Sequence, residues 1–199
     1  MGRWEPDGQG RLVQAALALY AERGFENTTV AEIAERAGLT ERTFFRHFAD
    51  KREVLFRGAG ALQEALVKGV AAAPEDLNPL DAVEAAFAAV DVFTPEFRPF
   101  SRLRQSIIVA TAELRERELI KLAALSAALT DALRRRGVKD PAASLAAEVG
   151  IAVFKIAFER WIDETNQQDF GQVMRESFDE LRAVTADERS LVTGRAPGI

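Results

Sequence analysis

The stretch GLTERTFFRHFADK, residues 38–51, gathers side chains that suit the binding of a polyanion. Arg42 and Arg46 lie one helical turn apart, and a guanidinium donates paired hydrogen bonds to a phosphate or to a guanine edge. Between them stand Phe44 and Phe45, and an amphipathic helix buries only one of two adjacent rings. The ring that stays outside, beside two cations, needs a binding partner.

Catalytic chemistry has little support in the sequence. The chain has no cysteine and a single histidine, His47, which excludes thiolate zinc sites and offers no evident nucleophile and base pair. No glycine-rich phosphate loop and no cluster of metal ligands is visible. The sequence therefore predicts a protein that is not an enzyme and needs no metal or cofactor.

The net charge of −5 is carried by the C-terminal part of the chain. Residues 1–57 contain nine Lys or Arg and nine Asp or Glu, so this segment is neutral as a whole. A neutral segment can still present a local cationic patch, because net charge governs solubility and long-range steering rather than the placement of single side chains. The length of 199 residues, with 48% of them apolar, permits one domain or two small ones.

The elements that must position these side chains are predicted to be helices. Residues 11–23 have a helical apolar stripe and are followed by Gly24, which is typical of a helix end. Thr29 and Glu32 have capping-box spacing, which predicts a second helix that ends near Gly38.

Two further caps follow at once. Thr40 is expected to be the N-cap of a third helix that runs to about His47. Asp50, with Glu53 three residues on, is predicted to cap a fourth helix that continues to about Ala73.

The chain beyond Pro74 keeps a helical period, and no segment shows the period-two alternation of a strand. Further helices are expected at roughly 79–92, 95–110, 112–136, 141–165 and 168–184. The predicted fold class is therefore all-α.

The tight connection between the second and third helices is typical of a helix-turn-helix, whose second helix can enter the major groove of DNA. In this arrangement Phe44 and Phe48 anchor the third helix to apolar residues of the first two. The expected anchoring partners are Leu12, Leu17, Ile33 and Leu39, and the outward residues are Glu41, Arg42, Phe45 and Arg46. One phenylalanine would hold the helix while its neighbour meets DNA, and a second core position is the alternative for Phe45.

Residues 11–56 closely resemble the N-terminal domain of TetR-type transcriptional regulators, through the run RLVQAALALYAERGFENTTVAEIAERAGLTERTFFRHFADKREVLF. The patterns G-F-x-x-T-T, I-A-x-x-A-G and F-x-x-K carry the resemblance. It implies an N-terminal three-helix DNA-binding domain joined to a C-terminal helical bundle for ligand binding and dimerisation. The expected bounds are 8–68 for the first, with the helix-turn-helix at about 29–48, 69–185 for the second, and flexible tails at 1–7 and 186–199.

Ten residues are predicted to contact DNA. Arg42 is expected to pair with guanine or, alternatively, to hold a phosphate. The resemblance implies a sugar-phosphate or thymine-methyl contact for Phe45 and a phosphate contact for His47, and Lys51 is expected to meet a phosphate near the start of the fourth helix. For the two threonines before the second helix, simple capping is an equal alternative. The full set is Thr28, Thr29, Thr40, Glu41, Arg42, Thr43, Phe45, Arg46, His47 and Lys51.

Aromatic residues in the second half of the chain suit either a packed core or an effector pocket between bundle helices. The pocket alternative predicts a small apolar or aromatic effector, with Arg104 as the main charged group near it. The candidate lining residues are Phe87, Phe97, Phe100, Leu103, Arg104, Ile107, Phe154, Phe158 and Trp161.

The last two long helices present apolar and small residues, among them Ala142, Ala146 and Gly150. Two such helices from each of two subunits would form a four-helix dimer interface, and burial of the same faces inside one subunit is the alternative. The predicted interface residues are Leu145, Val149, Val153, Ile156, Val173 and Phe178.

These features predict a homodimeric, ligand-responsive regulator that binds a palindromic double-stranded operator, most simply a repressor released by its effector. The alternative, a helical ligand carrier or interaction protein without DNA binding, would leave Arg42, Phe45, Arg46 and Lys51 unexplained. The first twenty residues have no apolar run before Leu12, and charges interrupt the richest apolar stretch. We therefore expect a cytoplasmic protein with no membrane partner.

Overall fold

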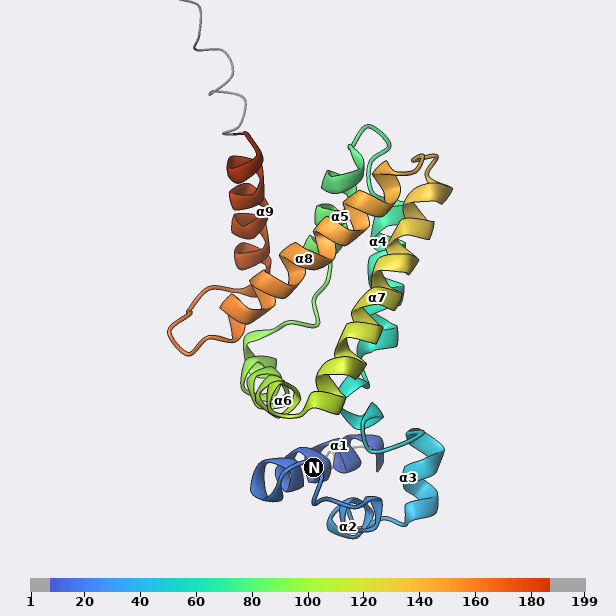
Figure 1. Cartoon of the computed structure of the whole chain (residues 1–199), viewed down its shortest axis with the longest axis vertical. Coiled ribbons are helices and arrows are strands. Elements are labelled where there is room, and N and C mark those ends of the chain that lie inside the picture. The colour runs from blue at the N-terminus through green and yellow to red at the C-terminus, as the bar shows by residue number, and fades with distance from the viewer. Residues whose placement is uncertain (1–7, 187–199) are drawn as a thin grey trace, which may run out of the picture. The chain divides into compact units, whose positions relative to one another are not determined.

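The computed structural model describes residues 8–186, and within this range the chain is helical, without strands, as predicted. The elements, labelled in Figure 1, are α1 (Gly8–Arg23), α2 (Val30–Arg36), α3 (Glu41–His47), η1 (Glu53–Phe56), α4 (Ala59–Ala72), α5 (Pro79–Ala88), η2 (Pro95–Phe97), α6 (Arg98–Ala110), α7 (Ala112–Arg135), α8 (Ala142–Ile162) and α9 (Phe170–Ala186). Except for Ala186, which ends α9, the predicted tails lie outside the described residues. None of the described helices has the length and apolar character needed to cross a membrane.

The chain divides into two compact units. Among the described residues, the first contains 8–61 together with Pro99–Ala123, and the second contains Leu62–Arg98 and 124–186. This division differs from the single boundary predicted after residue 68. The reason is that Ile107, Ile108 and Leu114, from α6 and α7, are buried in the same core as α1, α2 and α3.

The helix-turn-helix has the local signals that the sequence predicts. Gly24 and Gly38 take positive φ angles of 84° and 65°, a region that favours glycine because it has no Cβ. The capping box is formed: the Thr29 hydroxyl accepts from the Glu32 amide, and the Glu32 carboxylate accepts from the Thr29 amide. Thr40 caps α3 by accepting from the amide of Thr43.

The prediction of one fourth helix from Asp50 to Ala73 is wrong in its first part. Asp50 does cap a helical turn, since its carboxylate accepts from the amides of Arg52 and Glu53 at 2.8 and 3.2 Å. That turn is the short 3-10 helix η1, and α4 begins only at Ala59. Gly58 lies in the turn between them, and glycine has a low helix propensity.

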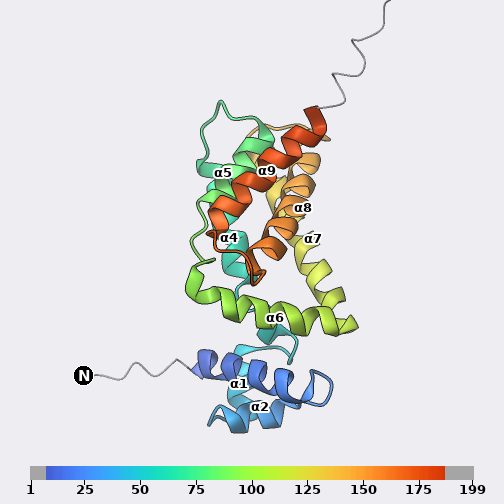
Figure 2. The same cartoon turned by 90° about the vertical axis from the view of Figure 1, so that its left-hand side faces the viewer.

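The second unit has its core where α5, α8 and α9 pack together (Figure 2). Gly150 of α8 faces α5 so closely that a Cβ placed there would lie 2.4 Å from Cγ1 of Val83. The absence of a side chain at position 150 therefore sets the approach of α8 to α5.

Candidate nucleic-acid interface

Helix α3 divides its side chains between a core face and an outward face. Phe44 is fully buried and Phe48 is buried beside it, in one cluster with Leu12, Leu17 and Ile33. Leu39 is partly buried against the same cluster. The predicted anchoring of the helix is therefore confirmed.

The outward face of α3 brings together four of the predicted DNA-contacting residues. Arg42, Thr43, Phe45 and Arg46 line an open depression of about 600 Å³. Phe45 has 55% of its surface exposed, and both arginines are exposed as well. Glu41 also faces outward at the start of the helix, whereas His47 at its end is half-buried.

The arginines of the first unit differ in whether they have internal partners. Of the seven between residues 8 and 61, four are engaged: Arg11 with the Ala37 carbonyl, Arg23 with Glu32, Arg36 with Glu22, and Arg52 with Asp50 and Glu113. Arg42, Arg46 and Arg57 have no hydrogen bond or ion pair from their guanidinium groups in the described part of the chain. Unpaired guanidinium groups are available to an external anion.

Lys51 has an internal role that the sequence did not reveal. Its Nζ donates to the carbonyls of Phe25 and Thr28 at 2.8 and 2.9 Å, and lies 4.3 Å from the centroid of the Phe25 ring. The Lys51 carbonyl in turn accepts from the Tyr20 hydroxyl at 2.7 Å. Lys51 therefore stabilises the connection between α1 and α2. Because its ammonium is already bound to carbonyls, these bonds do not support the predicted phosphate contact.

The threonines also have structural partners. Thr28 is fully buried and donates to the Gly24 carbonyl at 2.9 Å, so its hydroxyl is not presented to a ligand. Thr29 and Thr40 are exposed and serve as caps, and the hydroxyls of Thr40 and Thr43 lie 3.1 Å apart. The hydroxyls of Thr29, Thr40 and Thr43 lie near the surface even while they take part in these caps. Their contact with DNA stays a prediction.

Two family profiles match the chain. Residues 12–57 match the profile described as bacterial regulatory proteins, tetR family, and residues 77–186, more than half of the chain, match the MftR C-terminal domain. This chain belongs to the TetR family.

Individual relatives agree with this assignment. HTH-type transcriptional regulator TcmR of Streptomyces glaucescens is 44% identical over 80 residues, which are 40% of this chain and 35% of TcmR. The match thus spans about a third of the length of that relative. Putative mycofactocin biosynthesis transcriptional regulator MftR of Mycobacterium tuberculosis H37Rv is 26% identical over 166 residues, 81% of this chain and 83% of MftR. The fold also matches a putative transcriptional regulator from Pseudomonas aeruginosa PAO1 with a TM-score of 0.59 and 19% identity, covering 92% of this chain and 93% of that one.

The nine residues predicted to line an effector pocket in this TetR-family chain belong to both compact units. Phe87, Phe154, Phe158 and Trp161 lie in the second unit, clustered with Phe93 and Phe170, which the predicted set omitted. Phe97 belongs to that unit and is exposed. Phe93 lies in the connection after α5, and Phe170 is the first residue of α9.

The other four predicted pocket residues are Phe100, Leu103, Arg104 and Ile107 of the first unit. Ile107 is buried with the helix-turn-helix core, and Phe100 packs against that core. Arg104 donates from Nε to the Leu55 carbonyl at 2.6 Å and pairs with Glu118 at 3.5 Å. The charged group expected beside an effector thus has protein partners within the first unit.

The predicted dimer residues separate into two groups. Leu145 and Ile156 are 60% and 54% exposed on α8, and Val149 is half-buried between them. Val153, Val173 and Phe178 are buried inside the second unit, as is Gly150. The internal alternative therefore accounts for these buried residues, while the exposed α8 residues stay available to a partner.

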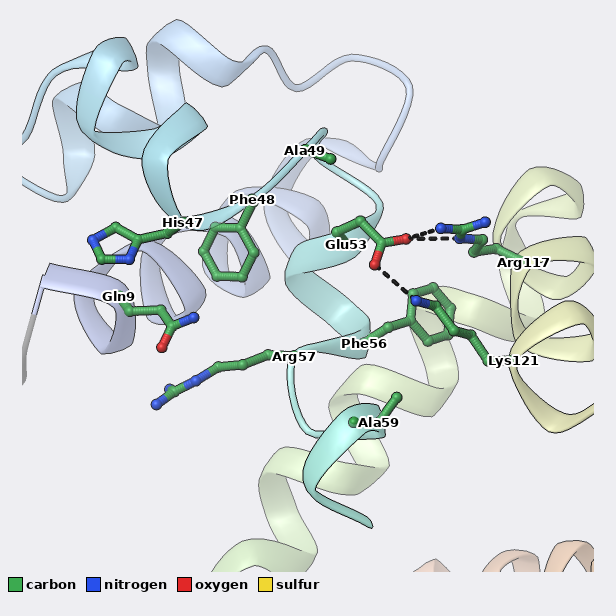
Figure 3. Close-up of a pocket in the computed structure, with 11 residues that line it drawn as sticks. Gln9, His47, Phe48, Ala49, Glu53, Phe56, Arg57, Ala59, Arg117 and Lys121 are labelled. Atoms are coloured by element: carbon green, nitrogen blue, oxygen red, sulfur yellow. Dashed lines mark hydrogen bonds and ion pairs between the residues drawn. The ribbon is translucent and has the colours of Figure 1, made fainter. Parts of the chain in front are cut away.

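Two residues outside the predicted sets, Gln9 and Arg57, also line a pocket. With His47 and Glu53 they contribute to a pocket of about 360 Å³ in the first unit, beside the C-terminal end of α3 (Figure 3). Among the described residues, no group of three or more His, Asp or Glu side chains is placed to hold a metal ion. The exposed guanidinium groups of Arg42, Arg46 and Arg57 are suited to hydrogen bonding and charge pairing with an anion.

Proposed function

We propose that this chain is a dimeric transcriptional repressor in the cytoplasm that binds a palindromic operator and leaves it when a small apolar effector binds. The observation that carries the proposal is the outward face of α3, where Arg42, Phe45 and Arg46 are exposed over a buried Phe44. The relatives named as transcriptional regulators support the same reading. A carrier without DNA binding would have no use for two unpaired guanidinium groups beside an exposed ring.

Each outward side chain of α3 has a distinct role in the proposed complex. Arg42 donates two parallel hydrogen bonds to O6 and N7 of guanine, and Glu41 accepts from cytosine N4. Phe45 packs against a thymine methyl or a sugar, and Arg46 holds a phosphate. Base contacts of this kind select the sequence, whereas the phosphate contacts fix the register of the helix.

DNA binding is tested by selecting duplexes from a random pool and measuring the affinity of the selected site against a scrambled one. Arg42→Ala is expected to weaken binding to the selected site by about 1–3 kcal/mol and binding to the scrambled site much less. Arg115→Ala removes another exposed, unpaired arginine, from α7, and should leave both affinities unchanged. A wild-type protein that selects no duplex would favour the carrier alternative.

The exposed stripe of α8 supports a dimer. Leu145, Val149, Ala152 and Ile156 are spaced by four, three and four residues, so they share one helical face opposite the face that packs on α5. A large exposed apolar stripe is typical of an interface between subunits. A two-fold dimer would place two copies of α3 in successive major grooves about 34–36 Å apart.

Dimerisation is tested with Ile156→Glu, which places a charge on this stripe. The variant should fold and sediment as a monomer, because an unpaired carboxylate is costly to bury in an interface. Val92→Glu is the control, since Val92 is a comparably exposed apolar residue of the same unit outside α8. If Ile156→Glu is still a folded dimer at micromolar concentration, this stripe of α8 does not form the interface.

The proposed effector site is the aromatic cluster of the second unit. Phe93 lies 4.3 Å from Phe170 and 5.8 Å from Trp161, measured between ring centroids. Nε1 of Trp161 and Nε of Arg98 are buried without a hydrogen-bond partner, and the Arg98 guanidinium lies 5.3 Å from the Trp161 ring. An apolar molecule that carries an acceptor oxygen would satisfy donors that the protein leaves unpaired.

Effector binding is tested by screening apolar acids and their amides for thermal stabilisation, since a ligand at a hundred times its Kd adds about 2.7 kcal/mol. Trp161→Phe keeps an aromatic ring and removes the hydrogen-bond donor. It should therefore weaken the binding of compounds that carry an acceptor more than the binding of compounds that lack one. Phe158→Ala, at a half-buried ring, should reduce effector affinity, whereas Phe87→Ala should chiefly cost about 3–5 kcal/mol of stability. If all three variants lose stability and none changes binding, the cluster is only a core.

A further inference from the structure

The pocket beside the C-terminal end of α3 has two sides of different character (Figure 3). On one side, the Glu53 carboxylate accepts from Nε of Arg117 at 2.7 Å and from Nζ of Lys121 at 2.9 Å. On the other side, the side chains of Gln9, His47 and Arg57 extend toward the same opening. The first side is an internal ion-pair network, and the second is open to a ligand.

The charges of the pocket do not cancel. Glu53 is the one carboxylate among its lining residues, whereas three cations, Arg57, Arg117 and Lys121, line the same pocket. Glu53 is already engaged by Arg117 and Lys121, which leaves Arg57 without an anion. A pocket with unbalanced positive charge is suited to an external anion.

Arg57 is free although carboxylates lie nearby in the sequence. Arg52, five residues earlier, is held by Asp50 at 2.6 Å and by Glu113 at 3.0 Å. The guanidinium of Arg57 has no such bond in the described part of the chain, and it is exposed in the turn between η1 and α4. The fold therefore presents this cation outward.

We infer that Arg57, together with Gln9 and His47, binds a phosphate of the DNA backbone next to the groove that α3 occupies. This inference rests on the proposed function, because it needs α3 to lie in a major groove. His47 is the last residue of α3 and also lines the pocket. A DNA strand that runs past this end of α3 therefore passes the opening of the pocket. The Arg57 guanidinium donates two hydrogen bonds to phosphate oxygens, and the Gln9 amide supplies a further donor.

A phosphate bound here adds affinity without sequence preference. Backbone contacts fix the position of the protein on the duplex and carry no base information. Each neutralised phosphate adds about 0.9 to the magnitude of the slope of log K against log salt. One such contact therefore makes the affinity fall by about a further 3.5-fold between 50 and 200 mM salt. Removal of Arg57 should thus lower the affinity for any duplex, whereas the effect of removing Arg42 should depend on the DNA sequence.

The test measures fluorescence anisotropy of the full chain with a selected duplex and a scrambled duplex, at salt concentrations from 50 to 200 mM. Arg57→Ala should weaken both duplexes by a similar factor, roughly tenfold at low salt. Its salt slope should fall by about one unit for each subunit bound. Arg57→Lys should retain the slope because it retains the charge, and Gln9→Ala should weaken binding with the slope unchanged.

Arg115→Ala is the matched control, since it removes an exposed, unpaired arginine from α7 of the same unit. An Arg57→Ala protein with wild-type slope and affinity, in an experiment where Arg42→Ala still loses the selected site, would overturn this inference and leave the proposed function intact. A wild-type protein that binds neither duplex would overturn both. Binding of inorganic phosphate that depends on Arg57, with an unchanged DNA slope, would assign the pocket to a free anion instead.

Discussion

Phe44 and Phe45 are neighbours in the chain with opposite environments: their ring centroids lie 5.5 Å apart at an interplanar angle of 82°, yet Phe44 is 0% exposed and Phe45 is 55% exposed. The edge-to-face contact couples the core of the first unit to its outward surface, because the buried ring supports the exposed one. Two adjacent aromatic residues thus serve anchoring and recognition on one short helix.

Replacing each phenylalanine by alanine should separate these roles. Phe44→Ala should lower the free energy of unfolding by about 3–5 kcal/mol, because it leaves a cavity in a closed core. Phe45→Ala should cost about 1 kcal/mol of stability, mainly through the lost ring contact, and weaken DNA binding. Urea unfolding and DNA anisotropy measure the two effects. Equal losses of stability would mean that both rings belong to the core.

Lys51→Ala should act on stability and not on the salt dependence of DNA binding. The Lys51 ammonium is bound to three carbonyls at the connection between α1 and α2, so its removal should cost about 1–3 kcal/mol. The salt slope should stay at the wild-type value because this cation is engaged internally. Lys68→Ala, at an exposed lysine of α4, is the control and should change neither quantity. A reduced slope with wild-type stability would instead restore the phosphate contact predicted from the sequence.

The helix ends of the first unit could be predicted because their causes are local. Thr29 with Glu32, Thr40, and Gly24 each act within a few residues, and each lies where its type and spacing indicated. The burial of Phe44 could also be predicted, since its spacing of four residues from Phe48 places both rings on one side of the helix. The choice of Phe45 for the outward face followed from the same pattern.

Other features depend on contacts between distant parts of the chain. Helix α8 is apolar on two faces, so its sequence does not tell that Val153 and Gly150 face inward while Ile156 faces outward. The bond from Arg104 to the Leu55 carbonyl joins residues 49 positions apart, and no local pattern announces it. The exposure of Arg57 has a related cause, because a fourth helix predicted to run from Asp50 to Ala73 has no break beside this residue.

Acid should weaken the ion pairs of Glu53. Burial acts to raise the pKa of the Glu53 carboxyl, but hydrogen bonds from Lys121 and Arg117 outweigh it, so the pKa lies below its ordinary value. A lowered pKa means that the stabilisation is present at neutral pH and is lost as the pH falls below about 4.3, the ordinary value for glutamate. Glu53→Gln should therefore cost about 1–3 kcal/mol at pH 7 and little once the wild-type carboxylate is protonated. Urea unfolding at several pH values between 7 and 3 measures the difference, and a difference that does not change with pH would contradict this account.

Gly150→Ala should destabilise the second unit although alanine is the better helix former. The new Cβ would lie 2.4 Å from Cγ1 of Val83, and Val83 is fully buried and β-branched, so its methyl group cannot easily rotate away. Overpacking costs about 1–3 kcal/mol, which exceeds or cancels the gain of about 1 kcal/mol in helix propensity.

Gly60→Ala in α4 is the matched control, because its Cβ would meet no atom within 4 Å and the substitution should be neutral or stabilising by up to about 1 kcal/mol. A double-mutant cycle then isolates the clash. Val83→Ala should cost less in the Gly150→Ala background than in the wild type, with a coupling of about 0.5–3 kcal/mol, because the smaller side chain at position 83 makes room for the new methyl group. If the two substitutions add without coupling, the close approach of α8 to α5 is not what requires glycine at position 150.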